Sequence, residues 1–331
     1  MTIRVAINGY GRIGRCILRA IFEYNRENDF EVVVINDTAG IEATAHFTEY
    51  DSTHGRFQGK VTLNHDHLII NNKVIDVISE RCPENLPWAK YNIDLVLECT
   101  GCFTSREDAM KHIQAGAKKI LISAPGENPD ATIVYGVNHH TLKTNDIIVS
   151  NASCTTNCLA PIVKPLHQEI GMINGLVNTI HAYTKDQALL DGTHSDWQRA
   201  RAAAHSIIPT KTGAAKAIGL VIPELKGKLD GFALRVPVMN VSIVDLSFTA
   251  ARDTSTAEIN EILTHAADGK VLCVNTVPLV SCDFNHHPAS AIVDLKQTKV
   301  IDRLVKVVAW YDNEWGFANR MLDTALCLFN C

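Results

Sequence analysis

Apolar and polar residues are arranged along the start of the chain as strands and helices of an α/β domain require. Residues 3–8 follow a strand-like alternation of apolar and polar positions, which ends at Gly9. Apolar residues then recur at helical spacing from Ile13 to Ile21. A short continuous apolar run at 32–35 is typical of a parallel strand that is buried on both faces. The order strand, glycine turn, helix, strand predicts a βαβ unit.

Further strand-like runs continue this alternation to about residue 150. A helix is expected over 109–117, directly before one of these runs. The runs occupy residues 68–70, 95–97, 120–122 and 147–149. Repeated alternation of strand and helix predicts an α/β domain with a doubly wound sheet of the Rossmann type, suited to binding a dinucleotide.

The pattern changes in the second half of the chain. Helices are expected at 159–171, with a kink at Pro165, and at 212–225. Residues 233–250 and 304–310 are rich in strand patterns with few helices between them. This texture predicts an α+β catalytic domain with a mixed sheet.

We therefore expect two domains within the 331 residues, a length that favours more than one core. The boundaries are placed at 1–152 for the dinucleotide-binding domain and 153–313 for the catalytic domain. A terminal helix at about 314–331 is expected to pack back on the first domain.

Composition and charge exclude several classes of function. The chain is 46% hydrophobic and carries a formal charge of −5, with no long basic run. A nucleic-acid or anionic-membrane surface therefore has no compositional support. The N-terminal residues lack a signal-peptide pattern, and no apolar stretch approaches the ~20 residues that span a bilayer. We expect a cytoplasmic protein with no nucleic-acid or membrane partner.

Ten cysteines are scattered along the chain rather than concentrated in a small scaffold. In a cytoplasmic protein most of them are expected to be reduced and buried. Cys99 and Cys102 have the spacing of a redox or zinc pair, but no second Cys or His pair lies nearby in the sequence. We interpret this pair as structural and expect no metal site.

A glycine-rich turn carries the strongest local signal. Residues 9–14, Gly-Tyr-Gly-Arg-Ile-Gly, fit G-x-G-x-x-G and lie between the predicted strand and helix. The first glycine permits the turn, the second lets the backbone approach a pyrophosphate, and the third allows close packing. Asp37 follows the next strand, where a carboxylate can accept hydrogen bonds from ribose hydroxyls. The two features together predict a dinucleotide site.

Cys154 is a candidate nucleophile. It lies between the strand-like run 147–149 and the helical segment that begins near Leu159. The positive end of a helix dipole favours the thiolate form of a cysteine placed there. A buried, inert cysteine is the competing interpretation and is the commoner one on cysteine statistics alone.

The motifs resemble the active-site and cofactor signatures of the phosphorylating glyceraldehyde-3-phosphate dehydrogenase family, and the resemblance covers essentially the whole chain. The matching segments are residues 7–15, 50–55, 123–125, 151–157, 212–216, 223–229 and 310–316. The resemblance implies oxidation of D-glyceraldehyde 3-phosphate to 1,3-bisphosphoglycerate with NAD and inorganic phosphate, in glycolysis or gluconeogenesis. It also implies a homotetramer, in which the loop 187–201 packs near the cofactor site of a neighbouring subunit.

The same resemblance implies roles for individual residues. Cys154 is the nucleophile, and His181 is the base that assists thioester formation. Asp186 is expected to orient Arg235, because its carboxylate would repel a phosphate. The cofactor residues are Gly9, Gly11, Arg12, Ile13, Gly14, Asp37, Arg81, Ser123 and Asn313. The substrate and phosphate residues are Ser153, Thr155, Thr184, Asp186, Arg199, Thr212, Gly213 and Arg235.

Coenzyme choice is the point at which the sequence departs from strictly NAD-preferring relatives. These tend to carry Leu-Pro where this chain has Gly192 and Thr193, and a threonine there resembles forms that also accept NADP. Asp37 argues for NAD, because a carboxylate repels a 2′-phosphate. NAD is therefore expected first, with NADP open.

Two alternative functions compete with this interpretation. Erythrose-4-phosphate dehydrogenase is a sister family with the same cysteine and dinucleotide motifs, and residues 278–286 are similar to it. That family tends to lack the threonine matching Thr184 and the pair matching Thr212 and Gly213, all of which are present here. The other alternative is a non-catalytic binding protein on the same scaffold, which the retention of Cys154 and His181 disfavours.

Overall fold

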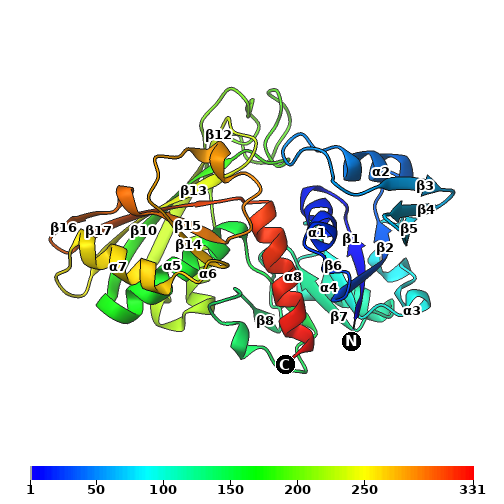
Figure 1. Cartoon of the computed structure of the whole chain (residues 1–331), viewed down its shortest axis with the longest axis horizontal. Coiled ribbons are helices and arrows are strands. Elements are labelled where there is room, and N and C mark those ends of the chain that lie inside the picture. Colours follow the sequence, from blue (N-terminus) through cyan, green and yellow to red (C-terminus); the bar gives the residue numbers. More distant parts are fainter. Residues whose placement is uncertain (1) are drawn as a thin grey trace. The chain divides into compact units, whose positions relative to one another are not determined.

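The computed structural model describes residues 2–331, which form two compact units. Unit 1 comprises the chain as far as Ile133, together with His139–Ser153 and Ala318–Cys331. Unit 2 comprises Val134–Asn138 and Cys154–Phe317. Figure 1 shows unit 1 mainly in blue and cyan and unit 2 mainly in green to orange.

Unit 1 is built on a nine-stranded sheet in which β1 occupies a central position. In spatial order the strands are β3 (Val61–Asn64), β4 (His67–Ile70), β5 (Lys73–Ile78), β2 (Phe30–Asn36), β1 (Ile3–Asn8), β6 (Leu95–Glu98), β7 (Lys119–Ile122), β9 (Ile148–Ser150) and β8 (Ala131–Thr132). All neighbours are parallel except β3 with β4 and β4 with β5. The chain leaves β1 toward β2 and later returns to β6 on its other side, which makes the gap between β1 and β6 a topological switch point. The predicted Rossmann-type sheet is confirmed.

The helices of unit 1 connect these strands, and its core is formed by strand residues such as Ala6, Val34, Val96 and Ile120 with the ring of Trp88. The helical elements are α1 (Arg12–Glu23), α2 (Ile41–Glu49), η1 (Pro83–Asn85), α3 (Trp88–Tyr91), α4 (Arg106–Gln114), η2 (His139–Thr141) and α8 (Trp315–Phe329), of which the residues from Ala318 belong to this unit.

The helix expected at 109–117 is displaced toward the N-terminus, since α4 spans Arg106–Gln114. Ser105 caps its first turn by accepting a hydrogen bond from the backbone N–H of Asp108 at 3.1 Å. Gly116, with φ +104°, ends it by taking the left-handed conformation that closes many helices. Capping residues, rather than apolar spacing, set the bounds of this helix.

Unit 2 is built on a sheet that is mixed, as predicted, and has eight strands. The strands in spatial order are β11 (Ile208–Lys211), β12 (Leu229–Val236), β10 (Met172–Ala182), β13 (Ser242–Ala250), β17 (Leu304–Tyr311), β15 (Ala291–Asp294) and β14 (Leu272–Asn275), with β16 (Lys299–Ile301) also paired to β17. The pairs β10–β12 and β14–β15 are parallel, and the others are antiparallel.

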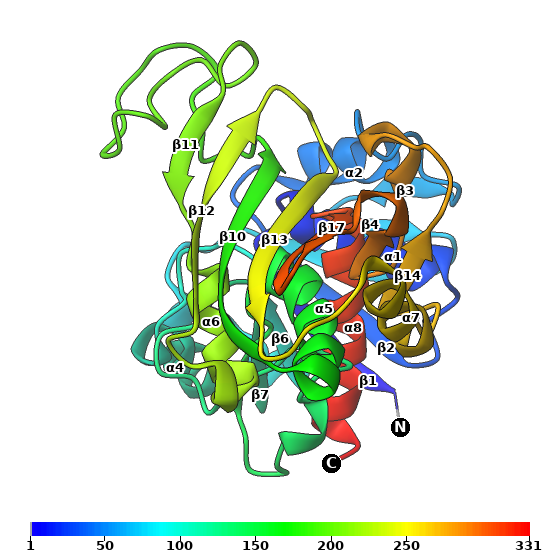
Figure 2. The ribbon, with the colours of Figure 1, turned by 90° about the vertical axis from the view of Figure 1, so that its left-hand side faces the viewer.

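Three helices pack on this sheet, with α5 on β13 and β15, α6 on β12 and α7 on β14 (Figure 2). The helical elements are α5 (Cys154–Ile170), α6 (Ala214–Val221), η3 (Pro223–Leu225), α7 (Thr256–Ala266), η4 (Ser281–Phe284) and η5 (Leu295–Gln297).

Helix α5 begins at Cys154, earlier than the expected start near Leu159. It continues through Pro161 and Pro165, although each proline removes a backbone hydrogen bond. Buried apolar side chains along α5 offset this loss, since tertiary packing supplies most of the stability of such a helix. The helix expected at 212–225 is the shorter α6, which ends before Pro223.

The register of the sheet in unit 2 determines which side chains share a face. His181 is the partner of Arg235, and Ser242 is the partner of Tyr311. Thr179 lies two residues before His181 and therefore points the same way. All five residues belong to the face that carries buried side chains, at the same end of the sheet.

Among residues 2–331, no helix is both long enough and apolar enough to cross a lipid bilayer.

Candidate active site

Cys154 and His181 lie within reach of each other in unit 2. Cys154 is the first residue of α5, and its Sγ atom is 3.5 Å from Nε2 of His181 near the end of β10. His181 is buried, whereas Cys154 remains half-buried. The pair that the sequence predicted as nucleophile and base is therefore in contact.

The other imidazole nitrogen of His181 is held by two groups. Nδ1 lies 2.7 Å from the carbonyl oxygen of Ala182 and 2.5 Å from Nη1 of Arg235, on the neighbouring strand β12. A guanidinium can only donate, so Arg235 favours a proton on Nε2. Donation from Nδ1–H to Ala182 instead leaves Nε2 free to accept a proton from the Cys154 side. The two partners of Nδ1 thus favour opposite tautomers.

Burial determines the charge states of this pair. Desolvation, reinforced by the charge of Arg235, lowers the pKa of His181 to about 3. Desolvation also raises the pKa of Cys154 above its ordinary value, although Arg235 and Thr155 act in the opposite direction. The positive end of the helix dipole favours the thiolate of Cys154, as expected, but the cost of burying the charge is larger and keeps the pKa above its ordinary value.

A cluster of three hydroxyl groups, from Thr155, Thr179 and Tyr311, lies next to Cys154 and His181. Tyr311 Oη lies 2.9 Å from Oγ1 of Thr155 and 2.8 Å from Oγ1 of Thr179, and its ring meets His181 edge-on. Burial raises the pKa of Tyr311 well above its ordinary value, which keeps it a neutral hydrogen-bonding group. The hydroxyl of Thr155, expected in a phosphate site, is instead engaged in this buried cluster.

Asp186 pairs directly with Arg199 rather than with Arg235, although its charge also acts on Arg235 in the direction that raises the pKa of the guanidinium. Asp186 Oδ2 accepts a hydrogen bond from Nη1 of Arg199 at 2.5 Å, and the Nε of Arg199 also donates to Oγ1 of Thr210 at 2.6 Å. The loop after β10 folds back so that Arg199, rather than the strand residue Arg235, lies beside the carboxylate. Arg235 Nε is left buried without an acceptor among the described residues.

The remaining predicted phosphate residues are tied locally. Thr184 Oγ1 donates to Oε1 of Gln187 at 3.2 Å, and Thr212 Oγ1 accepts from the N–H of Ala214 at the start of α6. Gly213 is the N-cap of α6, and a Cβ built on it would meet no atom within 4 Å. Ser153 is half-buried immediately before Cys154.

The glycine turn of unit 1 has the geometry that a dinucleotide requires. Gly9 has φ +90°, and a Cβ on it would lie 2.7 Å from the backbone nitrogen of Thr100. A Cβ on Gly14 would lie 2.3 Å from the carbonyl oxygen of Gly9. Gly11, the N-cap of α1, faces open space. The outer glycines thus satisfy packing, and the middle one leaves room at the helix N-terminus for a pyrophosphate.

Asp37, directly after β2, is bound to this turn. One carboxylate oxygen accepts from the N–H of Tyr10 at 2.7 Å, and the other accepts from Ala39 at 2.8 Å. Each oxygen retains a further lone pair for a ribose hydroxyl. These acceptors fit the adenosine ribose hydroxyls of NAD.

The other predicted cofactor residues are more dispersed. Arg12 forms an ion pair with Asp51, Arg81 is exposed, and half-buried Ser123 follows β7. Ile13 lies in the first turn of α1, between the second and third glycines. In unit 2, Asn313 is buried and its Oδ1 accepts from Ser242.

A buried network at the ends of β1 and β6 escaped sequence reasoning. Glu98 accepts hydrogen bonds from Nδ2 of Asn8 at 2.5 Å and from the N–H of Thr100 at 2.8 Å. Trp88 Nε1 donates to Nδ1 of His112, so Nε2–H of His112 points to Glu98 at 3.2 Å. This network holds the ends of β1 and β6 together at the switch point. The available sequence signal was that each of these apolar strands ends in a polar residue, Asn8 and Glu98.

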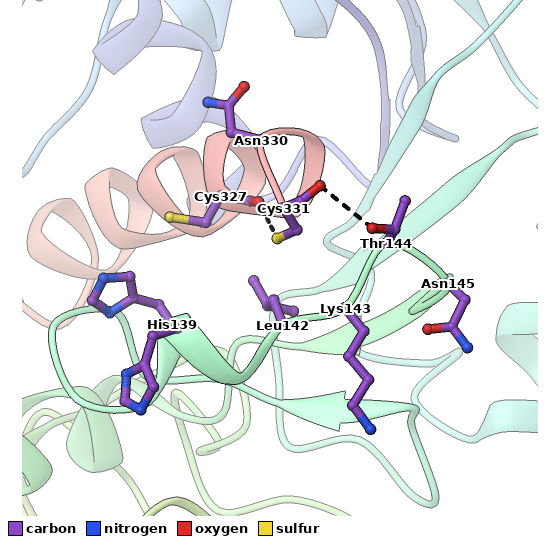
Figure 3. Close-up of a pocket in the computed structure, with 9 residues that line it drawn as sticks. His139, Leu142, Lys143, Thr144, Asn145, Cys327, Asn330 and Cys331 are labelled. Carbon is purple, nitrogen blue, oxygen red and sulfur yellow. Dashed lines mark hydrogen bonds between the residues drawn. The ribbon is translucent and has the colours of Figure 1, made fainter.

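Two pockets in unit 1 are separate from the groups with catalytic chemistry. One of about 600 Å³ lies between residues 139–145 and the end of α8 (Figure 3), and no predicted site residue lines it. The other, of about 430 Å³, is lined by Arg12, Arg15 and residues of the segment 46–56. Neither contains Cys154 or His181.

Comparison with known proteins identifies relatives along the whole chain. Residues 3–106 match the family profile "Glyceraldehyde 3-phosphate dehydrogenase, NAD binding domain", and residues 153–313 match the corresponding C-terminal domain. The chromosomal glyceraldehyde-3-phosphate dehydrogenase of Cupriavidus necator is 59% identical over 332 residues, covering 99% of both chains. The Pseudomonas aeruginosa protein of the same name is 57% identical, covering 99% of this chain and 98% of its own. That of Geobacillus stearothermophilus is 51% identical, covering 98% of both.

Proposed function

Because the chain belongs to the glyceraldehyde-3-phosphate dehydrogenase family, we propose that it oxidises D-glyceraldehyde 3-phosphate to 1,3-bisphosphoglycerate through a thioester on Cys154. The observation that carries this proposal is the 3.5 Å approach of the Cys154 sulfur to Nε2 of His181. The matching N-terminal domain is an NAD-binding domain, and NAD is the cofactor.

The first step is attack of the Cys154 sulfur on the aldehyde carbon. His181 Nε2 takes the thiol proton while the C–S bond forms and the C=O π bond opens. His181 then passes this proton to the former carbonyl oxygen, which gives a thiohemiacetal and a neutral imidazole. The neutral imidazole that burial maintains is the form able to accept a proton. The raised pKa of Cys154 makes such assistance necessary, because little thiolate forms unaided near neutral pH.

The second step converts the thiohemiacetal into a thioester. When bound, NAD supplies the acceptor for the hydride. His181 takes the hydroxyl proton while the C–H bond breaks, which regenerates a carbonyl still bonded to sulfur. Inorganic phosphate then attacks that carbonyl, the C–S bond breaks, and an acyl phosphate leaves with Cys154 restored.

Two anion sites serve this chemistry in the proposal. Arg235, whose buried Nε has no acceptor within residues 2–331, binds the substrate phosphate with Thr184. A phosphate on Arg235 offsets the charge that lowers the pKa of His181, so substrate binding makes the base stronger. Ser153, Thr212 and Gly213 serve the inorganic phosphate, with Arg199 nearby.

The cofactor residues are assigned in the same proposal. The turn 9–14 holds the pyrophosphate, Asp37 holds the adenosine ribose, and Asn313 hydrogen-bonds the nicotinamide carboxamide. Arg81 and Ser123 contribute from the ends of neighbouring segments. NADP is a weaker second coenzyme, since Asp37 opposes its 2′-phosphate while Thr193 supplies a donor.

We propose a cytoplasmic homotetramer in which residues 1–152 bind the cofactor and residues 153–313 carry the chemistry. Side chains on one face of the sheet in unit 2 support assembly, because Leu176, Phe232 and Leu304 share that face by register. They are 69%, 51% and 52% exposed, a large apolar exposure for one face of a sheet. Trp197 in the loop 187–201 is also exposed.

The erythrose-4-phosphate alternative is not favoured, because Thr184, Thr212 and Gly213 are all present and the relatives compared are named for the triose substrate. The deciding assay follows NAD reduction with glyceraldehyde 3-phosphate, with and without inorganic phosphate. We expect sustained turnover only with phosphate, and a lower kcat/KM for erythrose 4-phosphate. Turnover independent of phosphate, or a preference for the tetrose, would overturn the proposal.

A further inference from the structure

Ser242, the first residue of β13, connects two parts of the catalytic unit. Its side chain is buried, with a residue exposure of 1%. Its Oγ accepts a hydrogen bond from the N–H of Ala182 at 3.1 Å and donates one to Oδ1 of Asn313 at 2.9 Å. No role in cofactor binding follows for Ser242 from the sequence motifs.

We infer that Ser242 is a positioning residue that fixes the amide of Asn313 with its NH₂ group toward the nicotinamide carboxamide. The inference rests on the proposed function, which assigns Asn313 to the nicotinamide end of the cofactor. Beyond that assignment, Ser242 selects one orientation of the Asn313 amide. It also links this amide to β10, the strand that carries His181.

The numbers of donors and acceptors around Ser242 determine the orientation of the Asn313 amide. A serine hydroxyl has one hydrogen and can accept through its lone pairs. The N–H of Ala182 can only donate, so the hydroxyl hydrogen of Ser242 is available to Oδ1 of Asn313. If the amide were turned over, Nδ2 would donate to Oγ and the hydroxyl hydrogen would have no acceptor in a buried place. Ser242 therefore distinguishes the two amide orientations.

The selected orientation leaves a donor ready for a ligand. Within the described chain, Nδ2 of Asn313 has no hydrogen-bond partner, although the residue is buried. An unpaired amide N–H is complementary to a carbonyl oxygen, which the nicotinamide carboxamide offers. A turned amide would present Oδ1 instead and would repel that oxygen.

The same serine is joined to the base through one residue, Ala182. Ala182 donates its N–H to Ser242, while its carbonyl oxygen accepts from Nδ1 of His181 at 2.7 Å and from Arg235 at 3.0 Å. A displacement of Ala182 therefore reaches both the amide of Asn313 and the imidazole. Removing the hydroxyl of Ser242 leaves the N–H of Ala182 without its side-chain acceptor.

The test compares NAD with ADP-ribose, which lacks the nicotinamide, in equilibrium titrations by calorimetry. Ser242→Ala should weaken NAD binding about tenfold, the loss expected for an unsatisfied buried hydrogen bond, and leave ADP-ribose unchanged. Ser242→Thr keeps the hydroxyl and should restore most of the difference. Ser247→Ala on the same strand is the matched control, because no side-chain hydrogen bond is made by Ser247 within residues 2–331, and it should bind both ligands normally.

Equal weakening of NAD and ADP-ribose by Ser242→Ala would overturn the inference, since that pattern indicates general damage to the fold. Unchanged binding of both ligands would overturn it as well. A double-mutant cycle with Asn313→Ala adds a second test. Adding Ser242→Ala to Asn313→Ala should cause no further loss of NAD affinity. An additive loss would contradict the proposed role of Ser242. Failure of the native enzyme to oxidise glyceraldehyde 3-phosphate would refute the proposed reaction, while these titrations still decide the role of Ser242.

Discussion

The glycine turn of unit 1 and the catalytic corner of unit 2 are constructed in opposite ways. The turn is a continuous segment, residues 9–14, in which close contacts leave no room for a Cβ on the first and third glycines and the second faces open space. The corner combines Cys154 from α5, His181 from β10, Arg235 from β12 and Tyr311 from β17. A site made from neighbours in sequence can be recognised as a motif, whereas a site made from neighbouring strands depends on register.

The difference also appears in electrostatics. The turn and Asp37 present backbone N–H groups and a carboxylate in a partly open position. In the corner, burial depresses the pKa of His181 and raises that of Cys154, so neither group is charged before substrate arrives. The neutral pair in the corner thus suits proton transfer, while the turn and Asp37 suit hydrogen bonding to a dinucleotide.

The largest expected effect comes from removing the nucleophile. Cys154→Ser should lower kcat by roughly 10³-fold or more, because serine has a much higher pKa and no thioester can form. NAD binding and the fold should persist, as measured by calorimetry and circular dichroism. Substantial phosphate-dependent turnover in this variant would contradict the thioester mechanism.

Alkylation provides the control for that variant. Iodoacetamide should label Cys154 and spare Cys158, which is fully buried one turn further along α5 and whose pKa burial raises well above the ordinary value. Peptide mapping by mass spectrometry reports the sites. Preferential labelling of Cys158 would show that the thiol assignment is wrong.

The glycine turn is tested by a matched pair of substitutions. Gly14→Ala should destabilise the protein by about 2–4 kcal/mol, because the added Cβ would lie 2.3 Å from the carbonyl oxygen of Gly9. Gly11→Ala meets no atom within 4 Å, so it should change the free energy of unfolding little while weakening NAD binding. Chemical denaturation and NAD titration separate the two, and equal destabilisation by both substitutions would contradict the packing argument.

The corner is tested by pH. The pKa of His181 is about 3 in the folded protein, below the ordinary value of 6.5, so the unfolded state gains a proton first as pH falls. Stability attributable to this residue is intact above pH 6.5 and declines from there toward pH 3. At pH 5 the loss is about 2 kcal/mol.

His181→Asn should remove this acid-dependent loss. Urea unfolding at fixed protein concentration, compared at pH 7.5 and pH 5, measures it as a smaller pH dependence in the variant. An equal change in the free energy of unfolding between pH 7.5 and pH 5 in both proteins would show that His181 is not held neutral by its surroundings.

The smallest expected effect concerns the coenzyme. Asp37→Ala should weaken NAD about tenfold and spare or improve NADP, because it removes both the ribose acceptor and the charge that repels a 2′-phosphate. Thr193→Pro should reduce NADP use selectively. The ratio of kcat/KM for the two coenzymes is the measurement, and an equal loss for both coenzymes in Thr193→Pro would contradict the assigned role.

Local pattern by itself determined the alternation of strands and helices through residue 150, the glycine turn with Asp37, and the placement of Cys154 before a helix. These features depend on residues close together in the chain, through period, capping and turn geometry. The resemblance of longer segments added His181 as the base. The bounds of α4 and α5 were harder to predict from the sequence, because a cap at Ser105 and packing around Pro161 set them.

Only the tertiary structure decided which side chains meet across strands and loops. It paired Asp186 with Arg199 instead of Arg235, and it gave Ser242 a place between Ala182 and Asn313. The reason is that strand register and loop return join residues far apart in sequence, and a shift of one residue would turn each side chain to the other face. The charge states of Cys154 and His181 were decided there too, since a pKa depends on burial and neighbours that no local pattern specifies.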